Sequence, residues 1–183
     1  MKLKFMKKIF LLLFIGFAFS GCEKDDICDA NTPTTPRLII EFYDDANPTV
    51  LKNVVNLRVT EVVTNKSVVF NESLIETNEA RYLLNASKLS LPMKTGEDVV
   101  KYSFALNYGA APGENVDFFE INYTRENVYV SRACGYKTVF NLIDTNPILN
   151  TDASTPDGLW IKGINIETNA IENENETHVK IYF

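Results

Sequence analysis

Several pairs of carboxylates in this chain have a residue type and spacing that could support catalysis. Glycoside hydrolysis needs two Asp or Glu side chains at a set separation across the scissile bond. The candidate pairs are Asp44 with Asp45, Asp117 with Glu120, and Asp152 with Asp157. Each pair lies in or beside an expected turn, where solvated acids are ordinary. A carboxylate-dependent hydrolase acting on glycans or peptides is therefore an alternative function and not the leading one.

Other catalytic and metal-binding patterns are weaker still. His178 is the only histidine, and it falls on the expected polar face of the last strand, so we expect it to be exposed. No Gly-x-Ser-x-Gly sequence supplies a nucleophile, and one histidine leaves too few ligands for zinc. Asp144, Asp152 and Asp157 are weak calcium candidates, because they lack the Asp-x-Asp-x-Asp-Gly spacing. We therefore expect no catalytic residue, metal or cofactor, and a protein that is not an enzyme.

Three tyrosines are the weak candidates for ligand binding. Tyr43, Tyr129 and Tyr182 alternate with the apolar residues of their segments, so we expect their rings to be exposed. Exposed tyrosine rings stack on sugars and pack against peptides. The alternative is that they are edge residues of a sheet, which shows some rings in any case.

The charge balance restricts the class of partner. Removing residues 1–21 takes away four lysines, which leaves 14 basic against 24 acidic side chains and a net charge of −10. Such an acidic protein has no electrostatic route to nucleic acid, so we expect no nucleic-acid partner. A mature chain of about 160 residues suits one domain with a core of its own.

A period of two runs from Arg37 to the end of the chain and predicts β-strands. In Phe119–Tyr123, for example, apolar and polar residues alternate, as in a strand with one buried face. We expect a hairpin loop at 124–127 and, at most, a short helix within 71–84. About seven to nine short strands with frequent turns predict an all-β, antiparallel β-sandwich, immunoglobulin-like in architecture, as a single domain over 37–183.

Residues 1–21 resemble a bacterial lipoprotein signal peptide. Lysines precede an apolar run, Ile9 to Phe19, that is shorter than the about 20 residues that span a bilayer. Phe19-Ser20-Gly21-Cys22 then resembles a lipobox, in which the thiol of Cys22 accepts the lipid. We therefore expect lipidation of Cys22 and a mature protein held to a membrane by acyl chains. A plain secretory signal and a transmembrane anchor are the alternatives.

Residues 22–36 are expected to form a linker. Glu23-Lys24-Asp25-Asp26 is a charged run that keeps the tether solvated, and Pro33 and Pro36 discourage regular pairing. The charged run also resembles the Lys-plus-two-acids export signal of surface lipoproteins in Bacteroidetes. We therefore expect a lipid anchor in the outer membrane. The protein would then be displayed either on the cell surface or on the periplasmic leaflet, and the sequence is compatible with both.

Cys28 and Cys134 remain as an even pair once Cys22 carries lipid. Even pairs outside the cytoplasm usually join. A bond would close a loop of about 105 residues, which the chain-entropy model values at roughly 4–5 kcal/mol. We therefore expect a Cys28–Cys134 disulfide that ties the tether to the folded domain; two unrelated thiols are the alternative.

Several stretches of the chain resemble a group of uncharacterised flavobacterial (Bacteroidetes) envelope lipoproteins known only as a domain of unknown function. The stretches are Cys22 to Cys28, Arg37 to Asp44, Asn122 to Leu142, Asp157 to Trp160, and Asn173 to Phe183. The resemblance implies an envelope location and a single domain, and it carries no site residues.

The leading hypothesis from the sequence is a non-catalytic binding module. Its expected partners are the membrane, through the acyl anchor, and an unknown envelope protein or glycan. The hydrolase described above and a structural accessory subunit of an envelope assembly are the two alternatives.

Overall fold

The computed structural model describes residues 27–29, 32, 34–153 and 157–183, and it is nearly all β. The expected signal peptide, the lipidated Cys22 and much of the expected linker lie outside the described residues. The chain divides into two compact units, Met1–Thr32 with Tyr129–Tyr136, and Pro33–Val128 with Lys137–Phe183. In the described residues, no helix is both long enough and apolar enough to cross a membrane.

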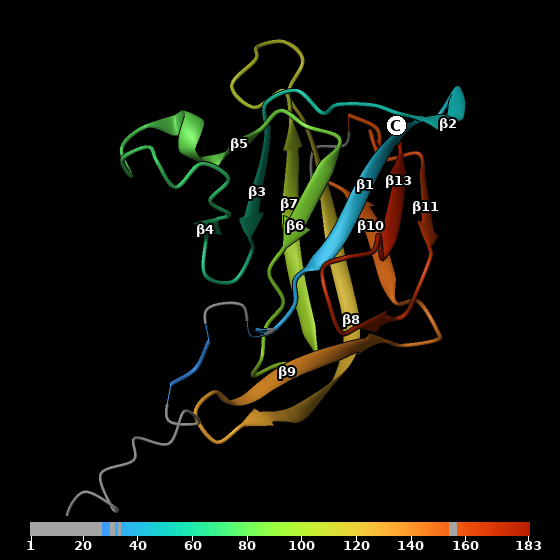
Figure 1. The fold of residues 1–183 in the computed structure, drawn as a ribbon. Helices are drawn as coiled ribbons and strands as arrows, with labels where there is room; N and C mark the ends of the chain where they lie inside the picture. The colour runs from blue at the N-terminus through green and yellow to red at the C-terminus, as the bar shows by residue number, and fades with distance from the viewer. Residues whose placement is uncertain (1–26, 30–31, 33, 154–156) are drawn as a thin grey trace, which may run out of the picture. The chain divides into compact units, whose positions relative to one another are not determined.

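The first sheet of the larger unit has strand β1 at its centre (Figure 1). Its order is β11 (Gly163–Ile166), β13 (Val179–Tyr182), β1 (Leu38–Asp44) and β2 (Asn47–Leu51), with β6 (Lys88–Leu91) also paired to β1. The β1–β13 pair is parallel, with Ile40 opposite Val179, and the other pairs of this sheet are antiparallel. The first and last strands of the unit are therefore direct neighbours.

The second sheet is antiparallel in its registered pairs and packs against the first. Its order is β12 (Ala170–Ile171), β9 (Gly135–Leu142), β8 (Asn115–Ser131), β7 (Val99–Leu106), β3 (Leu57–Glu61) and β4 (Lys66–Ser67), while β10 (Ile148–Asp152) pairs with β8 and β5 (Leu83–Leu84) with β3. A 3₁₀ helix, η2 (Glu79–Tyr82), lies in the excursion between β4 and β5.

Alternating side chains from both sheets fill the core, so the predicted all-β sandwich is confirmed. Phe104 and Phe119 face each other across β7 and β8 with ring centroids 5.0 Å apart. The Trp160 ring lies against Phe42 and Phe183, and its Nε1–H donates to the Phe104 carbonyl at 3.0 Å. This bond satisfies the indole of a ring that is otherwise buried in apolar surroundings.

The predicted hairpin loop at 124–127 is wrong, because β8 continues through this segment to Ser131. The turn comes later, before β9, where Gly135 has φ 69°. Residues 124–127 are exposed but extended, and side-chain bonds hold them: Arg125 Nε donates to Asp98, and Thr138 Oγ1 donates to Asn127. A polar strand that is exposed on both faces has the amino-acid composition of a loop. The composition of residues 124–127 therefore predicted a loop where the chain is extended. The short helix expected within 71–84 is present as η2.

The smaller unit contains the expected disulfide. Cys28 and Cys134 are bonded, with their Cα atoms 4.9 Å apart. Cys28 lies within the expected linker, and Cys134 lies in the turn between β8 and β9, so the bond joins the linker to this turn.

The expectation that His178 is exposed is wrong, because the side chain is fully buried. Its Nδ1 accepts the Ile39 N–H at 2.8 Å, and its own backbone N–H donates to the Ile39 carbonyl at 3.0 Å. The ring therefore extends the β1–β13 ladder by one residue. Burial lowers the pKa of His178, against the opposing influences of Glu176, the Asn173 backbone and Glu174. No well-aligned hydrogen bond from a described residue ends on Nε2.

The buried histidine gives a testable pH dependence. Below about pH 6.5, its ordinary pKa, the unfolded chain binds a proton at His178 that the folded chain does not. The free energy of unfolding should therefore fall with decreasing pH, with a slope of up to about 1.4 kcal/mol per unit from this residue. In His178→Asn, the amide oxygen can still accept from Ile39 but does not titrate. When the free energy of unfolding is measured in urea between pH 7.5 and 5, it should depend less steeply on pH in the variant than in the natural chain. Equal pH dependence in the two would contradict this role of His178.

Candidate functional site

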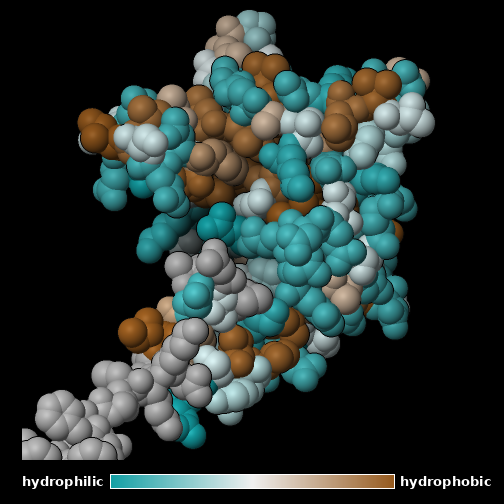
Figure 2. All heavy atoms as spheres, in the orientation of Figure 1, coloured by the Kyte–Doolittle hydropathy of each residue, from teal (hydrophilic) through white to brown (hydrophobic). Residues whose placement is uncertain are grey.

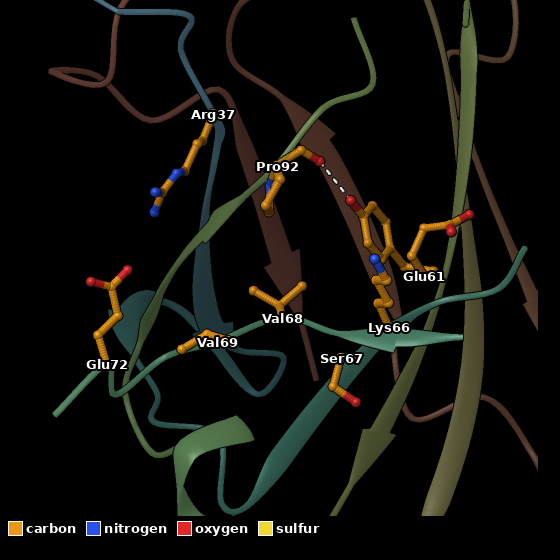
Figure 3. A pocket seen from close by; sticks show the side chains of 9 residues that line it. Arg37, Glu61, Lys66, Ser67, Val68, Val69, Glu72 and Pro92 are labelled. Atoms are coloured by element: carbon orange, nitrogen blue, oxygen red, sulfur yellow. Dashed lines mark hydrogen bonds between the residues drawn. The ribbon is translucent and has the colours of Figure 1, made fainter. Parts of the chain in front are cut away.

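A groove in the larger unit combines an apolar floor with charged side chains at its rim. We call it the β4–β6 groove, because β4 lies on one side and the end of β6 on the other (Figure 3). Its volume is about 300 Å³, at the lower end of the range of ligand pockets. The residues that line it are Arg37, Glu61, Lys66, Ser67, Val68, Val69, Glu72, Pro92 and Tyr102.

Strand β4 is positioned by its pairing with β3. Thr60 lies opposite Ser67 and Glu61 opposite Lys66. The Ser67 hydroxyl lies 3.0 Å from Thr60 Oγ1, and it accepts from Arg58 Nε at 3.0 Å. Arg58 also pairs with Glu79 of η2 at 2.8 Å, so a single guanidinium ties β3 to β4 and to the short helix.

The excursion between β4 and β5 carries Glu72 to the groove. The carbonyl of Arg81 accepts the backbone N–H groups of Phe70 and Asn71 at 2.9 and 3.1 Å. Its guanidinium donates to the carbonyls of Glu72 and Leu74. Asn78 caps η2 by accepting the Ala80 N–H at 3.0 Å, which fixes the start of the turn that contains Arg81. Glu72 is therefore held by its backbone, and its carboxylate remains exposed.

The floor of the groove is largely apolar. Val68, like Phe70 and Leu84, packs against the core, and Figure 2 shows hydrophobic side chains gathered over the segment that carries β4 and β5. The surface over β1 and β6 is largely hydrophilic in the same view. Tyr102 closes the floor, and its hydroxyl donates to the Pro92 carbonyl at 2.7 Å. Burial raises the pKa of Tyr102 above its usual range, so this hydroxyl stays a donor.

Glu61 is the ionised group at the base of the groove, and its carboxylate serves the turn that follows β3. Oε1 accepts the Val63 N–H at 3.0 Å, Oε2 accepts the Thr64 N–H at 2.6 Å, and Lys94 Nζ lies 3.2 Å from Oε1. Burial alone would raise the pKa of Glu61, but the hydrogen bonds from Thr64, Val63 and Lys94 outweigh it and lower the pKa to about 2. A carboxylate that is charged and fully bonded in this way cannot act as a general acid near neutral pH.

The rim of the groove carries charges that no described residue pairs. Arg37, Lys66 and Glu72 are exposed, and none of their side chains takes part in an ion pair or hydrogen bond within the described residues. Figure 3 shows the Arg37 guanidinium and the Glu72 carboxylate pointing toward one another across the open end. The site therefore combines an apolar floor with polar groups that are free to meet a ligand.

The three candidate tyrosines do not meet at one site. Tyr43 and Tyr182 are half-buried and lie together, with ring centroids 5.8 Å apart, and the Tyr43 hydroxyl donates to Glu41. Tyr129 belongs to the smaller unit, where it is 57% exposed and forms an edge-to-face pair with Tyr136. It also lines a second cleft, of about 450 Å³, beside Cys134.

Two of the candidate carboxylates, Asp117 and Asp152, accept hydrogen bonds from the backbone. Asp117 is fully buried, and its Oδ2 accepts the Ile161 N–H at 2.9 Å. Burial raises the pKa of Asp117, and its strand partner Asp152 adds to this effect. Asp152 in turn accepts the N–H groups of Ala153 and Gly158 at 2.7 and 3.0 Å. Neither acid lines either of the two clefts described above.

The calcium candidates do not form a metal centre in the part of the chain that the structure describes. No group of three or more His, Cys, Asp or Glu side chains converges there. Asp144 instead accepts from Asn169 at 3.5 Å, while Asp152 holds the turn to Gly158.

No sequence motif marks the groove, because its residues come from separate segments of the chain. Arg37 precedes β1, Lys66 to Glu72 follow the turn after β3, and Pro92 follows β6. One signal was available: Glu61 stands in phase with the buried Leu57 and Val59, and Asp117 with Phe119. An acid on the apolar phase of a strand indicates a buried carboxylate with a specific partner.

The network around Glu61 generates a stability prediction. Because the pKa of Glu61 is lowered in the folded chain, its charge stabilises the fold above about pH 4.5, and this contribution is lost as the pH falls toward 2. At pH 7, Glu61→Gln should lower the free energy of unfolding by about 1–3 kcal/mol, the cost of hydrogen bonds to a charged group. The deficit should shrink in denaturation curves recorded toward pH 2. The exposed Glu126→Gln is the matched control, and a deficit for Glu61→Gln that is independent of pH would contradict the assignment.

The comparisons with known proteins give a family without a function. Neither the curated proteins nor the solved structures contain a match to this chain. The family of unknown function DUF6452 matches residues 56–183, which include β3 to β13 and all of the groove except Arg37. The chain therefore belongs to the DUF6452 family.

Proposed function

We propose that this chain is a lipid-anchored binding module of the bacterial cell envelope that holds an envelope protein or glycan in the β4–β6 groove. The resemblance of Phe19 to Cys22 to a lipobox supports the anchor, and the acidic run after Cys22 supports display on the outer membrane. The resemblance to flavobacterial (Bacteroidetes) envelope lipoproteins agrees with both.

One observation carries the proposal: the groove has free charges at its rim, while the polar groups at its base are already bonded. Arg37, Lys66 and Glu72 can meet a ligand, whereas Glu61 holds a turn and Tyr102 holds Pro92. Binding sites are typically apolar concavities with a few placed polar groups. Acid–base catalysis needs, in addition, a group that can exchange its proton at the working pH. The groove has the first property, and at its base burial and hydrogen bonds hold Glu61 charged and Tyr102 neutral near pH 7.

The two alternatives have less support. A carboxylate-dependent hydrolase requires two acids beside a substrate, but the desolvated Asp117 is bonded to Ile161 beneath the surface. A structural accessory subunit of an envelope assembly would also use an exposed surface, and the exposed Tyr129–Tyr136 pair is the observation that favours it. Aromatic rings of this kind are enriched at protein interfaces.

The anchor is tested by replacing the expected lipidation site. Cys22→Ala should release the protein from membranes into a soluble envelope fraction, because a protein without acyl chains loses its hydrophobic attachment. Fractionation of cells with an antibody to the folded domain measures this. A variant that still sediments with membranes, and resists extraction by carbonate, would contradict the lipid anchor.

The groove is tested by photo-crosslinking in intact cells. A photo-reactive amino acid at Glu72, on the rim, should give a reproducible crosslinked product, whereas the same group at Glu126, away from the groove, should not. Arg37→Glu should reduce the yield several-fold, because it reverses a free rim charge. Lys162→Glu, an exposed charge reversal outside the groove, is the matched control and should leave the yield unchanged.

Two outcomes would overturn the binding proposal. Equal products from positions 72 and 126 would show that contact does not involve the groove. Hydrolysis of an envelope glycan by the purified chain, abolished by Asp117→Asn, would instead support the hydrolase.

A further inference from the structure

The β4 strand is a free edge of the second sheet. It stands at the end of the strand order, and its pairing partner is β3. It is also short, covering Lys66 and Ser67. An edge strand presents backbone N–H and C=O groups that another extended chain can pair with.

The hydrogen-bond register shows which residues of β4 face outward. The Val68 N–H donates to the Val59 carbonyl at 2.8 Å, and Glu61 lies opposite Lys66. Since backbone groups alternate along an antiparallel strand, Lys66 and Val68 face β3. Ser67 and Val69 then face away from it. Within the described residues, no hydrogen bond is made by the outward N–H and C=O groups of Ser67 and Val69.

These outward groups line the β4–β6 groove, since Ser67 and Val69 both belong to its wall. They are two residues apart, which is the spacing at which a paired strand makes successive hydrogen bonds on one side. Val68 and Val69 are half-buried and add apolar surface beside the backbone. The groove therefore offers both backbone pairing and a place for a side chain.

The opposite wall does not offer a second template. The Phe42 N–H donates to the Ser87 carbonyl, and Leu89 lies opposite Ile40, so alternate residues of β6 bond to β1. Lys88, Ser90 and Pro92 then face away from β1. Proline has no N–H, and the Pro92 carbonyl already accepts the Tyr102 hydroxyl. Lysine and proline at these positions block pairing along β6, as they do on other protected edges.

The free charges of the groove select the chemistry of the occupant. The full chain has a net charge of −6, yet the unpaired rim charges are Arg37 and Lys66 against Glu72. Glu61 lies buried at the base, where its oxygens already accept the Val63 and Thr64 N–H groups and contact Lys94, which Glu61 shares with Glu97. The rim therefore favours an acidic side chain in a protein whose remaining surface repels acids.

We propose that the β4–β6 groove binds an extended acidic peptide of a partner protein as an added strand, paired to the backbone of Ser67 and Val69 with its acidic side chain between Arg37 and Lys66. This inference rests on the proposed function and names the ligand class of the same groove. Main-chain pairing supplies affinity in such complexes, and the alternating side chains supply specificity. Because β4 is short, the pairing extends over few residues.

The test starts from a phage-displayed library of random linear heptapeptides, selected on the full chain purified in detergent. The enriched peptides should lack proline at the central positions and carry Asp or Glu. In hydrogen exchange measured by NMR, binding of an enriched peptide should lower the exchange rates of the Ser67 and Val69 amides at least about tenfold. The Lys66 and Val68 amides, which already face β3, should change little.

Variants separate backbone pairing from side-chain contact. Val69→Pro removes an outward N–H. It should lower the affinity for the enriched peptide about tenfold, which corresponds to the loss of one hydrogen bond. Val69→Ala keeps the N–H and is the matched control. Should Val69→Pro fail to fold, N-methylation of alternate amides in the peptide makes the same test on the natural chain, and one of the two alternating methylation patterns should abolish binding.

The outcomes distinguish this inference from the function on which it rests. Peptides that bind with Arg37-dependent affinity, but without protection of the Ser67 and Val69 amides, would overturn strand addition and leave groove binding intact. A library that yields no peptide above an empty-resin control would overturn the peptide ligand, while crosslinking at Glu72 still tests for a glycan. Equal binding to Val69→Pro and the natural chain would also overturn strand addition.

Discussion

The parallel pairing of β1 with β13 is the constraint on which the rest of the larger unit depends. It joins the first strand of the unit to the last, and a parallel pair has no local turn to form it. His178 extends the ladder at one end by accepting the Ile39 N–H, and Phe183 extends it at the other by donating to the Tyr43 carbonyl. The pairing therefore engages β1 from Ile39 to Tyr43.

Strand β1 transmits this constraint to the groove. Its other edge pairs with β6 and β2, so its position fixes theirs. Arg37 directly precedes β1, and Pro92 directly follows β6, so one wall of the groove is set by the pairing of β1. The other wall comes from β4, which is set by Arg58 and Glu61 in the second sheet. Both sheets must be in place before the groove exists, although no groove residue contributes to the β1–β13 pair.

The fold could be predicted from the sequence where alternation reports burial. Phe119, Ile121 and Tyr123 alternate with polar residues and are buried as expected. The prediction failed where the amino-acid composition does not match the backbone conformation. Residues 124–127 are polar, as loops are, but form part of a long strand. His178 also misled, because it precedes β13 and its burial depends on Ile39, more than 130 residues earlier in the chain. Contacts over such distances leave no trace in a local pattern.

The candidate site was harder to predict than the fold for the same physical reason. Its outward backbone groups at Ser67 and Val69 depend on which strands end each sheet, and strand order is not encoded in any one segment. The disulfide was the exception, since counting cysteines after the expected lipidation of Cys22 leaves one pair, and the structure contains the Cys28–Cys134 bond.

The buried acids and the buried histidine of the described residues share one task, which bears on the choice between binding and catalysis. Glu61 accepts two turn amides after β3, Asp117 accepts the Ile161 amide, and His178 accepts the Ile39 amide. In each case a side chain bonds a backbone N–H at a place where a regular ladder ends or is interrupted. The bond to the backbone offsets part of the cost of burying each group, although Asp117 Oδ1 and His178 Nε2 have no hydrogen-bond partner among the described residues. At the surface, the rim charges and the outward β4 backbone groups make no hydrogen bond or ion pair within the described residues, and such groups are suited to recognition.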